Sequence, residues 1–116
     1  MKFDKKSFLN KWESQVRKGL LDYIILLYLN EKQYYGYELI SDIKKISEME
    51  ISEGTIYPLL NRMQKDGLIT SSWVEMEVGI PRKYYKILPE GKDVLKNMKN
   101  SWSQINTILH KLMAVK

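Results

Sequence analysis

Hydrophobic positions recur at helical spacing in several stretches of the chain. The first, residues 7–29, begins as an amphipathic helix and becomes apolar nearly all round from residue 23. A helix of that kind is buried on most sides. After a polar break at residues 30–34, a second helix is predicted over residues 36–46. Its apolar side chains share one face, namely Leu39, Ile40, Ile43 and Ile46.

A third helix is predicted over residues 52–67, with a defined start and end. Ser52 can cap its N-terminus, and Gly67 occupies the position after the last turn where helices favour glycine. Pro58 removes one helix hydrogen bond, but unpaired N–H groups are already present near a helix start, so the cost is tolerable. One stripe of this helix is apolar, formed by Ile56, Leu59, Leu60 and Met63.

The next stretch is typical of an antiparallel hairpin. Residues 68–76 and 82–88 are rich in β-forming residues, and a turn at residues 77–81 is marked by glycine and proline. A short strand is also expected around residues 49–51. Pro89 suits the first turn of a last helix that runs to residue 113. Because a hairpin alone is marginal in water, it is expected to pack on the helices.

This order of elements predicts a mainly α fold with a small β-hairpin (α+β), as in a winged helix-turn-helix. We expect residues 1–88 to form the winged domain with its N-terminal helix, and residues 89–116 a dimerisation helix. The chain has 116 residues, 44% of them hydrophobic, which suits one domain with a modest core.

Composition excludes several classes of function. The chain has no cysteine and one histidine, His110, so neither disulfides nor thiolate or histidine metal sites are expected. We find no catalytic constellation and no phosphate loop, so the sequence indicates neither an enzyme nor a cofactor. No apolar run is long enough for a membrane span and the N-terminus is unlike a secretion signal, so a cytoplasmic protein is expected.

The outward face of the third helix carries residue types that contact DNA. Asn61 and Arg62 can read base edges, whereas Tyr57 and Lys65 can hold phosphates. The formal net charge of +5 permits an anionic partner. Basic side chains near the hairpin tip would grip the backbone beside that helix. An ordinary solvated helix face and a solvated hairpin tip remain alternatives.

Three motifs, "YYGYELI", "EGTIYPLLNRMQKDGLI" and "PRKYYKILPEG", together resemble the PadR family of transcriptional regulators. The resemblance runs from about residue 17 to the C-terminus and implies a homodimeric winged-helix repressor of the short branch. The chain lacks two features that are usual in the family. Leu88 stands where the family usually has a threonine that caps the last helix, and Ile80 stands where the family wing often has an arginine. The DNA-binding positions that the resemblance implies are Tyr35, Tyr37, Thr55, Tyr57, Pro58, Asn61, Arg62, Lys65, Arg82 and Lys83.

The last helix has an apolar seam with alternating steps of three and four residues, as in a heptad repeat. We expect it to pair with a second copy, which would present two recognition helices to a pseudo-palindromic operator in double-stranded DNA. The alternative is that this helix packs back on its own domain. The predicted dimer interface consists of Leu9, Trp12, Val16, Leu95, Met98, Trp102, Ile105, Leu109 and Leu112.

Trp102 lies in "SWS", which is similar to the multidrug-binding branch of the family, where this tryptophan stacks on flat aromatic compounds. That branch has an acid at the position of Asn106, so a preference for cations is not expected. Alternatively, Trp102 only fills the interface. The ligand site implied by the resemblance comprises Trp102, Met98, Ile105, Asn106, Val16, Leu20 and Tyr23.

The sequence therefore predicts a repressor whose operator binding responds to an aromatic ligand at the dimer interface. The alternative is a winged-helix module that binds proteins and senses no ligand.

Overall fold

The computed structural model describes residues 2–47 and 51–115. Most of the strand expected at residues 49–51 lies outside the described residues; Ile51, which is described, is buried and belongs to no strand. The elements are α1 (Lys5–Glu31), β1 (Tyr34–Tyr35), α2 (Gly36–Ser47), α3 (Glu53–Lys65), β2 (Ile69–Val74), β3 (Arg82–Ile87) and α4 (Pro89–Ala114). This is the predicted α+β winged helix-turn-helix.

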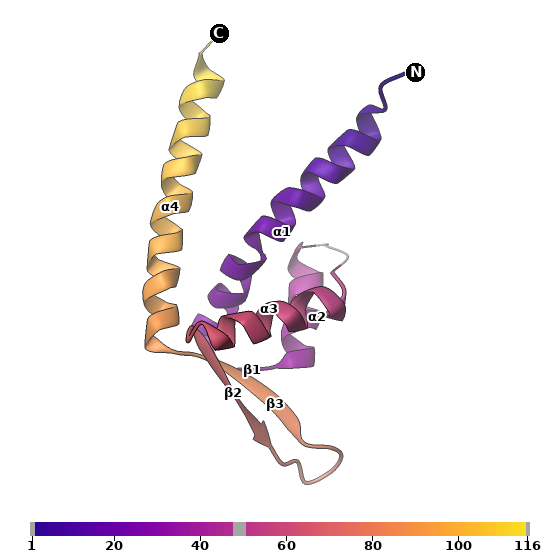
Figure 1. Cartoon of the computed structure of the whole chain (residues 1–116), viewed down its shortest axis with the longest axis vertical. Helices are drawn as coiled ribbons and strands as arrows, with labels where there is room; N and C mark the ends of the chain where they lie inside the picture. The colour runs from indigo at the N-terminus through magenta and orange to yellow at the C-terminus, as the bar shows by residue number, and fades with distance from the viewer. Residues whose placement is uncertain (1, 48–50, 116) are drawn as a thin grey trace.

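A small antiparallel sheet lies at one end of the molecule (Figure 1). Its strand order is β1-β3-β2, with Tyr34 opposite Tyr85 and Ile69 opposite Ile87. The hairpin of β2 and β3 was predicted, but β1 was not, because residue 34 was assigned to a polar break. A strand of two residues is too short to show the alternation that identifies strands in a sequence.

The ends of the helices follow local chemistry. Asp4 caps α1 through a 3.1 Å hydrogen bond from the Ser7 N–H, so α1 begins two residues earlier than predicted. Gly67 has a φ of +78°, and its N–H donates to Gln64 while that of Leu68 donates to Met63. These bonds form the glycine cap that the sequence predicts. Ser52 stands at the N-cap of α3, but its side chain caps no backbone group.

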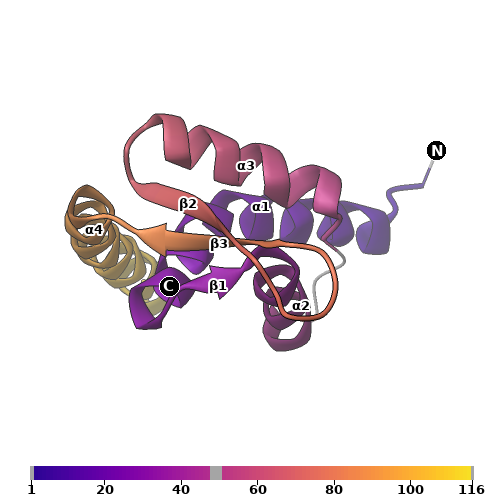
Figure 2. The same cartoon turned by 90° about the horizontal axis from the view of Figure 1, so that it is seen from below.

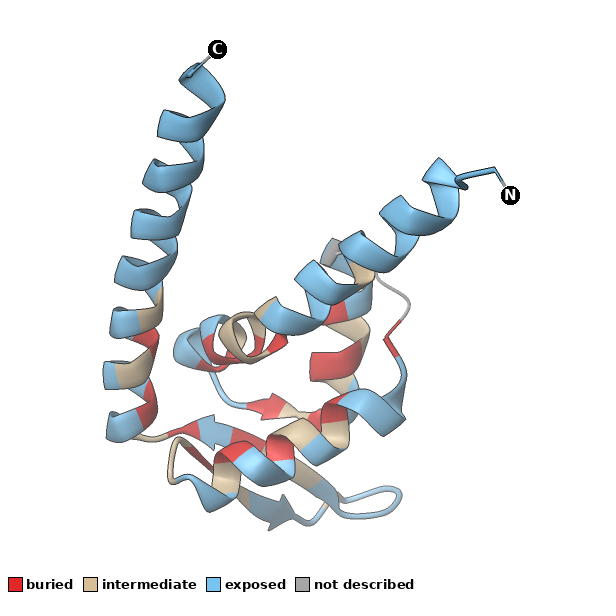
Figure 3. Cartoon of the chain, turned by 45° about the horizontal axis from the view of Figure 1, so that its top comes forward, coloured by how far each residue is buried: buried red, intermediate tan, exposed pale blue. Residues whose placement is uncertain are grey.

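The core gathers around the C-terminal half of α1, which supplies Leu21, Ile25, Leu26 and Leu29. Helices α2 and α3, strand β3 and the start of α4 pack around it, as the buried positions in Figure 3 show. The start of α4 lies against the residue that precedes β2: the Leu88 N–H donates to the Leu68 carbonyl at 2.9 Å, and Gly91 approaches that same carbonyl closely.

Two helical segments project from this core, residues 5–20 of α1 and residues 99–114 of α4, called the arms below. They diverge from the domain, and both chain termini lie at the same end (Figure 1). The radius of gyration is 17.4 Å, whereas a compact chain of this length has about 13 Å. The accessible surface is 8980 Å², against about 6,600 Å² for a compact monomer. The arms therefore leave much surface uncovered.

No helix in residues 2–47 and 51–115 combines the length and the hydropathy that crossing a membrane would require.

Candidate nucleic-acid interface

Helix α3 presents one face to the core and another to the outside. Ile56, Leu60 and Met63 are buried. The opposite face carries Pro58, Asn61 and Lys65, all exposed. Pro58 does not interrupt the helix, since α3 runs continuously from Glu53 to Lys65. The hairpin of β2 and β3, with its connecting loop at residues 75–81, lies beside α3 and is called the wing (Figure 2).

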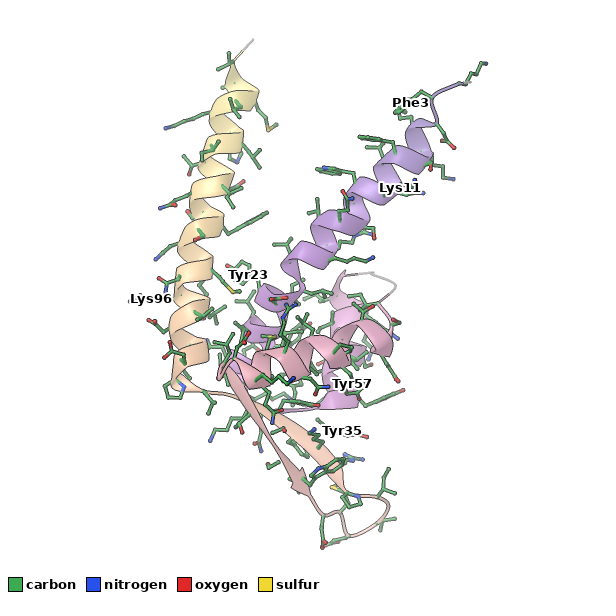
Figure 4. The ribbon with its side chains drawn as sticks, in the orientation of Figure 1. Phe3, Lys11, Tyr23, Tyr35, Tyr57 and Lys96 are labelled. Atoms are coloured by element: carbon green, nitrogen blue, oxygen red, sulfur yellow. The ribbon has the colours of Figure 1, made fainter. Side chains whose placement is uncertain are left out.

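A cleft of about 420 Å³ separates α3 from the wing. It brings together Tyr35, Tyr57, Asn61 and Lys83, four of the residues that sequence reasoning assigned to DNA binding. Tyr35 and Tyr57 are labelled in Figure 4 on facing elements, β1 and α3. The cleft is completed by residues outside that prediction, namely Gly36, Trp73, Ile80, Pro81 and Tyr85.

Two cations of the wing, Arg82 and Lys83, lie over aromatic rings. The Arg82 guanidinium is 4.9 Å from the centre of the Tyr35 ring. The Lys83 Nζ is 5.8 Å from the Trp73 ring centre and 5.7 Å from that of Tyr85. Such contacts attract a cation to the ring face and limit where it moves. The wing therefore offers positive charge at defined places beside α3.

The floor of the cleft depends on a glycine. A Cβ on Gly36 would lie 3.2 Å from the Tyr57 hydroxyl and 3.3 Å from the Tyr85 ring, so a larger residue would push these rings away. Burial, with the nearby charge of Glu53, raises the pKa of the Tyr57 phenol. Burial also raises the pKa of Tyr85. Both phenols stay neutral near pH 7, and a neutral phenol can donate a hydrogen bond to an anion.

The remaining positions on the predicted DNA face differ in what they contact. Tyr37 is exposed beside Tyr35, with ring centres 6.4 Å apart. Thr55 is exposed, and its Oγ1 lies 3.2 Å from the Ser52 Oγ. Arg62 turns toward α1 instead of outward: its Nη2 donates to the Asp22 Oδ2 at 3.1 Å. An arginine at the edge of the outward face can reach α1 because its side chain is long.

A second cavity, of about 580 Å³, lies among α1, α3 and α4. Of the predicted ligand residues it contains Leu20, Tyr23, Met98, Trp102 and Ile105. Figure 4 labels Tyr23 on the side of α1 toward α4. Val16 and Asn106, also predicted, do not line this cavity. Its wall includes polar residues that the sequence did not suggest, namely Lys18, Asp22, Arg62, Asn97 and Ser101.

The arms carry an exposed apolar stripe. Of the predicted dimer residues, Leu9, Trp12, Val16, Trp102, Ile105, Leu109 and Leu112 are exposed, and Met98 is half-buried. Leu95 differs from the prediction, because it is 2% exposed and packs in the core of its own chain. The first turns of α4 dock on α1, so part of the last helix does pack back on its own domain. Only its later turns are left uncovered.

The family described as "Transcriptional regulator PadR-like family" matches residues 25–97, from the apolar half of α1 to the start of α4. The chain belongs to this family. PadR-like proteins are DNA-binding transcription regulators and not enzymes, so the elements described above belong to a DNA-binding regulator.

Solved structures of PadR-like regulators are similar to this chain. A PadR-like transcriptional regulator of Bacillus cereus is 38% identical, with a TM-score of 0.78, and the match covers 88% of this chain and 99% of that one. A PadR family regulator of Eggerthella lenta is 29% identical, with a TM-score of 0.87 and 96% of both chains covered. Uncharacterized protein X of Lysinibacillus sphaericus is 32% identical over 102 residues, 86% of this chain and 94% of that protein.

Among the site residues that sequence reasoning missed, Trp73, Tyr85 and Asp22 matter most for the geometry. Trp73 and Tyr85 reach the cleft from β2 and β3 of the wing. The alternation of strand residues puts Trp73 on one side of β2 but does not say which side meets α3. Asp22 lies 40 positions from Arg62 in the chain, and no local pattern signals a pair so distant.

Proposed function

We propose that this PadR-like regulator is a homodimeric repressor acting in the cytoplasm on a pseudo-palindromic operator. We further propose that a planar aromatic molecule bound near Trp102 modulates its binding to DNA. The observation that carries the proposal is the apolar stripe left exposed on both arms of a chain whose winged domain is otherwise complete.

The surface area supports a dimer. The chain exposes 8980 Å², about 2,400 Å² more than a compact monomer of its mass. Permanent dimers bury about 2,000 Å² or more in total. A second copy has the same stripe, so a two-fold interface would cover both at once. Trp12, Leu109 and Leu112 would then leave water together with their partners' equivalents.

The two-fold arrangement supports the operator symmetry. Each copy would offer an α3 whose outward face carries Asn61 and Lys65, and a wing carrying Arg82 and Lys83 for the phosphates. Dimeric helix-turn-helix proteins contact half-sites about one DNA turn apart. Occupying such a site within a promoter would block transcription.

The ligand proposal is based on the cavity among α1, α3 and α4. Trp102 and Tyr23 give it aromatic walls, and Met98 and Ile105 give it apolar area. Flat rings stack on such side chains. In a dimer the open side of this cavity would be closed by the second copy. A ligand would change operator affinity only if it binds the DNA-compatible and DNA-incompatible arrangements of the dimer unequally.

Genome-wide footprinting of the protein on its own DNA would identify the operator, and binding would then be measured over a series of salt concentrations. Lys65→Ala should weaken binding and make the slope of log K against log salt shallower by about 0.9. Lys96→Ala, on the side of α4 that Figure 4 shows turned away from α1, removes the same charge as a control and should change little. Equal affinity for both variants at all salt concentrations would contradict DNA binding through α3. Capture of a protein partner without DNA binding would instead favour an interaction module.

Tryptophan fluorescence tests the ligand site. Planar aromatic compounds should quench the wild-type emission, and Trp102→Ala should lose that response while remaining dimeric. Trp73→Phe, on the wing, serves as the matched control and should keep it. If Trp102→Ala binds the compounds equally well, the ligand site lies elsewhere.

A further inference from the structure

An ion pair ties the recognition helix to the central cavity. The Arg62 Nη2 near the end of α3 donates to the Asp22 Oδ2 of α1 at 3.1 Å. Both side chains line the cavity that also contains Trp102 of α4. Of the three ion pairs among the described residues, the other two are local contacts, Glu13 with Arg17 and Lys32 with Glu38. Among the described residues, this pair is therefore the ion pair that links α3 to another element.

The two residues of the ion pair differ in how firmly the fold fixes their positions. Asp22 stands between Leu21 and the buried turn of Ile25 and Leu26, so its backbone is fixed by the core. Arg62 projects from the last turns of α3, next to Asn61 and one turn before Lys65, both on the outward face. A rotation of its long side chain would bring the guanidinium from the α1 side to that face. Asp22 is thus a fixed anion beside a movable cation.

The pair is open to exchange. The Arg62 side chain is 62% exposed and that of Asp22 is 37% exposed. Exposed ion pairs are weak, because water and salt screen the charges. A DNA phosphate is also an anion, and it forms well-matched hydrogen bonds with a guanidinium. A phosphate beside α3 could therefore displace the carboxylate, which would be difficult for a buried pair.

We propose that Asp22 is a positioning residue that holds Arg62 on the α1 side in the free protein and competes with DNA phosphate for it. This inference rests on the proposed function, in which α3 meets the operator. Because the pair forms part of the cavity wall, an occupant that engages Asp22 frees Arg62 for DNA. An occupant of the cavity that engages Arg62 keeps this side chain from contacting DNA. The ion pair thus connects the cavity to the recognition helix without requiring the helices to move.

The test compares Asp22→Asn with wild type on the footprinted operator over a salt series without added ligand. Asparagine keeps the shape and removes the competing charge. Binding should become about threefold tighter at low salt, and the slope of log K against log salt should steepen by part of the roughly 0.9 that one full phosphate contact contributes, because Arg62 reaches a phosphate in a larger share of the complexes than in wild type. Glu13→Gln is the matched control: it also removes an acid from an exposed pair on α1, but Glu13 neither pairs with α3 nor lines the cavity. It should leave the slope unchanged.

A double variant separates positioning from a general effect of charge. Arg62→Gln should make the slope shallower than wild type, and Asp22→Asn combined with Arg62→Gln should match Arg62→Gln alone, because Asp22 acts through Arg62. Circular dichroism would verify that each variant folds. Weaker binding by Asp22→Asn, or additive effects in the double variant, would overturn the inference.

Failure of the inference is distinguishable from failure of the proposed function. If Lys65→Ala weakens operator binding but Arg62→Gln does not, the regulator binds DNA through α3 and only the role of Asp22 is wrong. If wild type and all variants lack operator binding, both the proposed function and this inference are wrong.

Discussion

At the scale of single residues, the wing holds two of its cations on aromatic rings. Lys83 lies between Trp73 and Tyr85, and Arg82 lies over Tyr35. A cation held in this way loses less conformational freedom when it meets a phosphate than a lysine free in water. The cleft between α3 and the wing is therefore suited to hold one stretch of DNA backbone in a fixed position.

We expect Lys83→Gln to weaken operator binding and to make the salt slope shallower by about 0.9, because one phosphate contact is lost. Lys86→Gln is the matched control. Lys86 is on the same strand but does not line the cleft, and Lys83 does. Binding isotherms at four salt concentrations would provide both slopes. Equal slopes for the two variants would mean that the cleft does not face the DNA backbone.

The buried phenols predict how stability depends on pH. Burial raises the pKa of Tyr34, Tyr57 and Tyr85 above the ordinary value of 10.0. The unfolded chain therefore loses these protons at lower pH than the folded chain. Their contribution to stability is complete below pH 10.0 and is lost as the pH rises through the higher folded values.

The free energy of unfolding should consequently fall when urea denaturation is repeated at alkaline pH, from about pH 9 to about pH 11. Tyr85→Phe has no proton to lose at that position, so its stability should fall less steeply over the same range. An equally steep fall in this variant would show that Tyr85 does not contribute to the pH dependence.

At the scale of elements, the junction between β2 and α4 decides where the last helix points. Gly91 has no room for a Cβ, because one would collide with the Leu68 carbonyl and would lie 2.8 Å from an Ile87 side-chain carbon. The backbone carbonyl of Leu68, just before β2, cannot move aside as a flexible side chain could. The direction of α4 therefore depends on this close approach.

Gly91→Ala should destabilise the fold by about 1–3 kcal/mol, the usual cost of overpacking. Gly54→Ala is the control, because a Cβ there would meet only the Ser52 Oγ at an ordinary 3.6 Å. Helix propensity predicts that this control is neutral or slightly stabilising. Thermal unfolding of both variants without DNA measures the difference. Similar melting temperatures for the two would mean that the start of α4 can shift without cost.

Sequence reasoning succeeded for elements with a long pattern and failed for contacts between distant segments. Helix α3, its glycine end and the wing strands were predicted because periodicity and turn residues are local signals. Strand β1 has only two residues, and the turn of Arg62 toward Asp22 depends on how α1 and α3 cross. Leu95 was assigned to the dimer seam because a heptad pattern does not say which turns of a helix dock on the same chain.

At the scale of the whole molecule, the winged domain and the arms differ in how well their apolar side chains are covered. The winged domain has a complete core, with buried side chains from α1, all three strands and the start of α4. The arms have no such cover, and their apolar stripe faces solvent in the single chain (Figure 3). Folding of the domain and pairing of the arms should therefore be separable by mutation.

Leu109→Glu should convert the proposed dimer into a monomer while the winged domain stays folded, because Leu109 is 48% exposed on its own chain and touches no part of the core cluster. Light scattering after size exclusion would measure the mass, and circular dichroism the fold. Lys96→Glu is the control on the same helix, on the side that Figure 4 shows turned away from α1, and should remain dimeric. The monomer should also bind the operator more weakly, since two half-sites would no longer be held by one particle. A Leu109→Glu protein that keeps the dimer mass would contradict pairing through the arms. A monomer with undiminished operator affinity would instead contradict the proposal that two copies of the protein contact two half-sites of the operator.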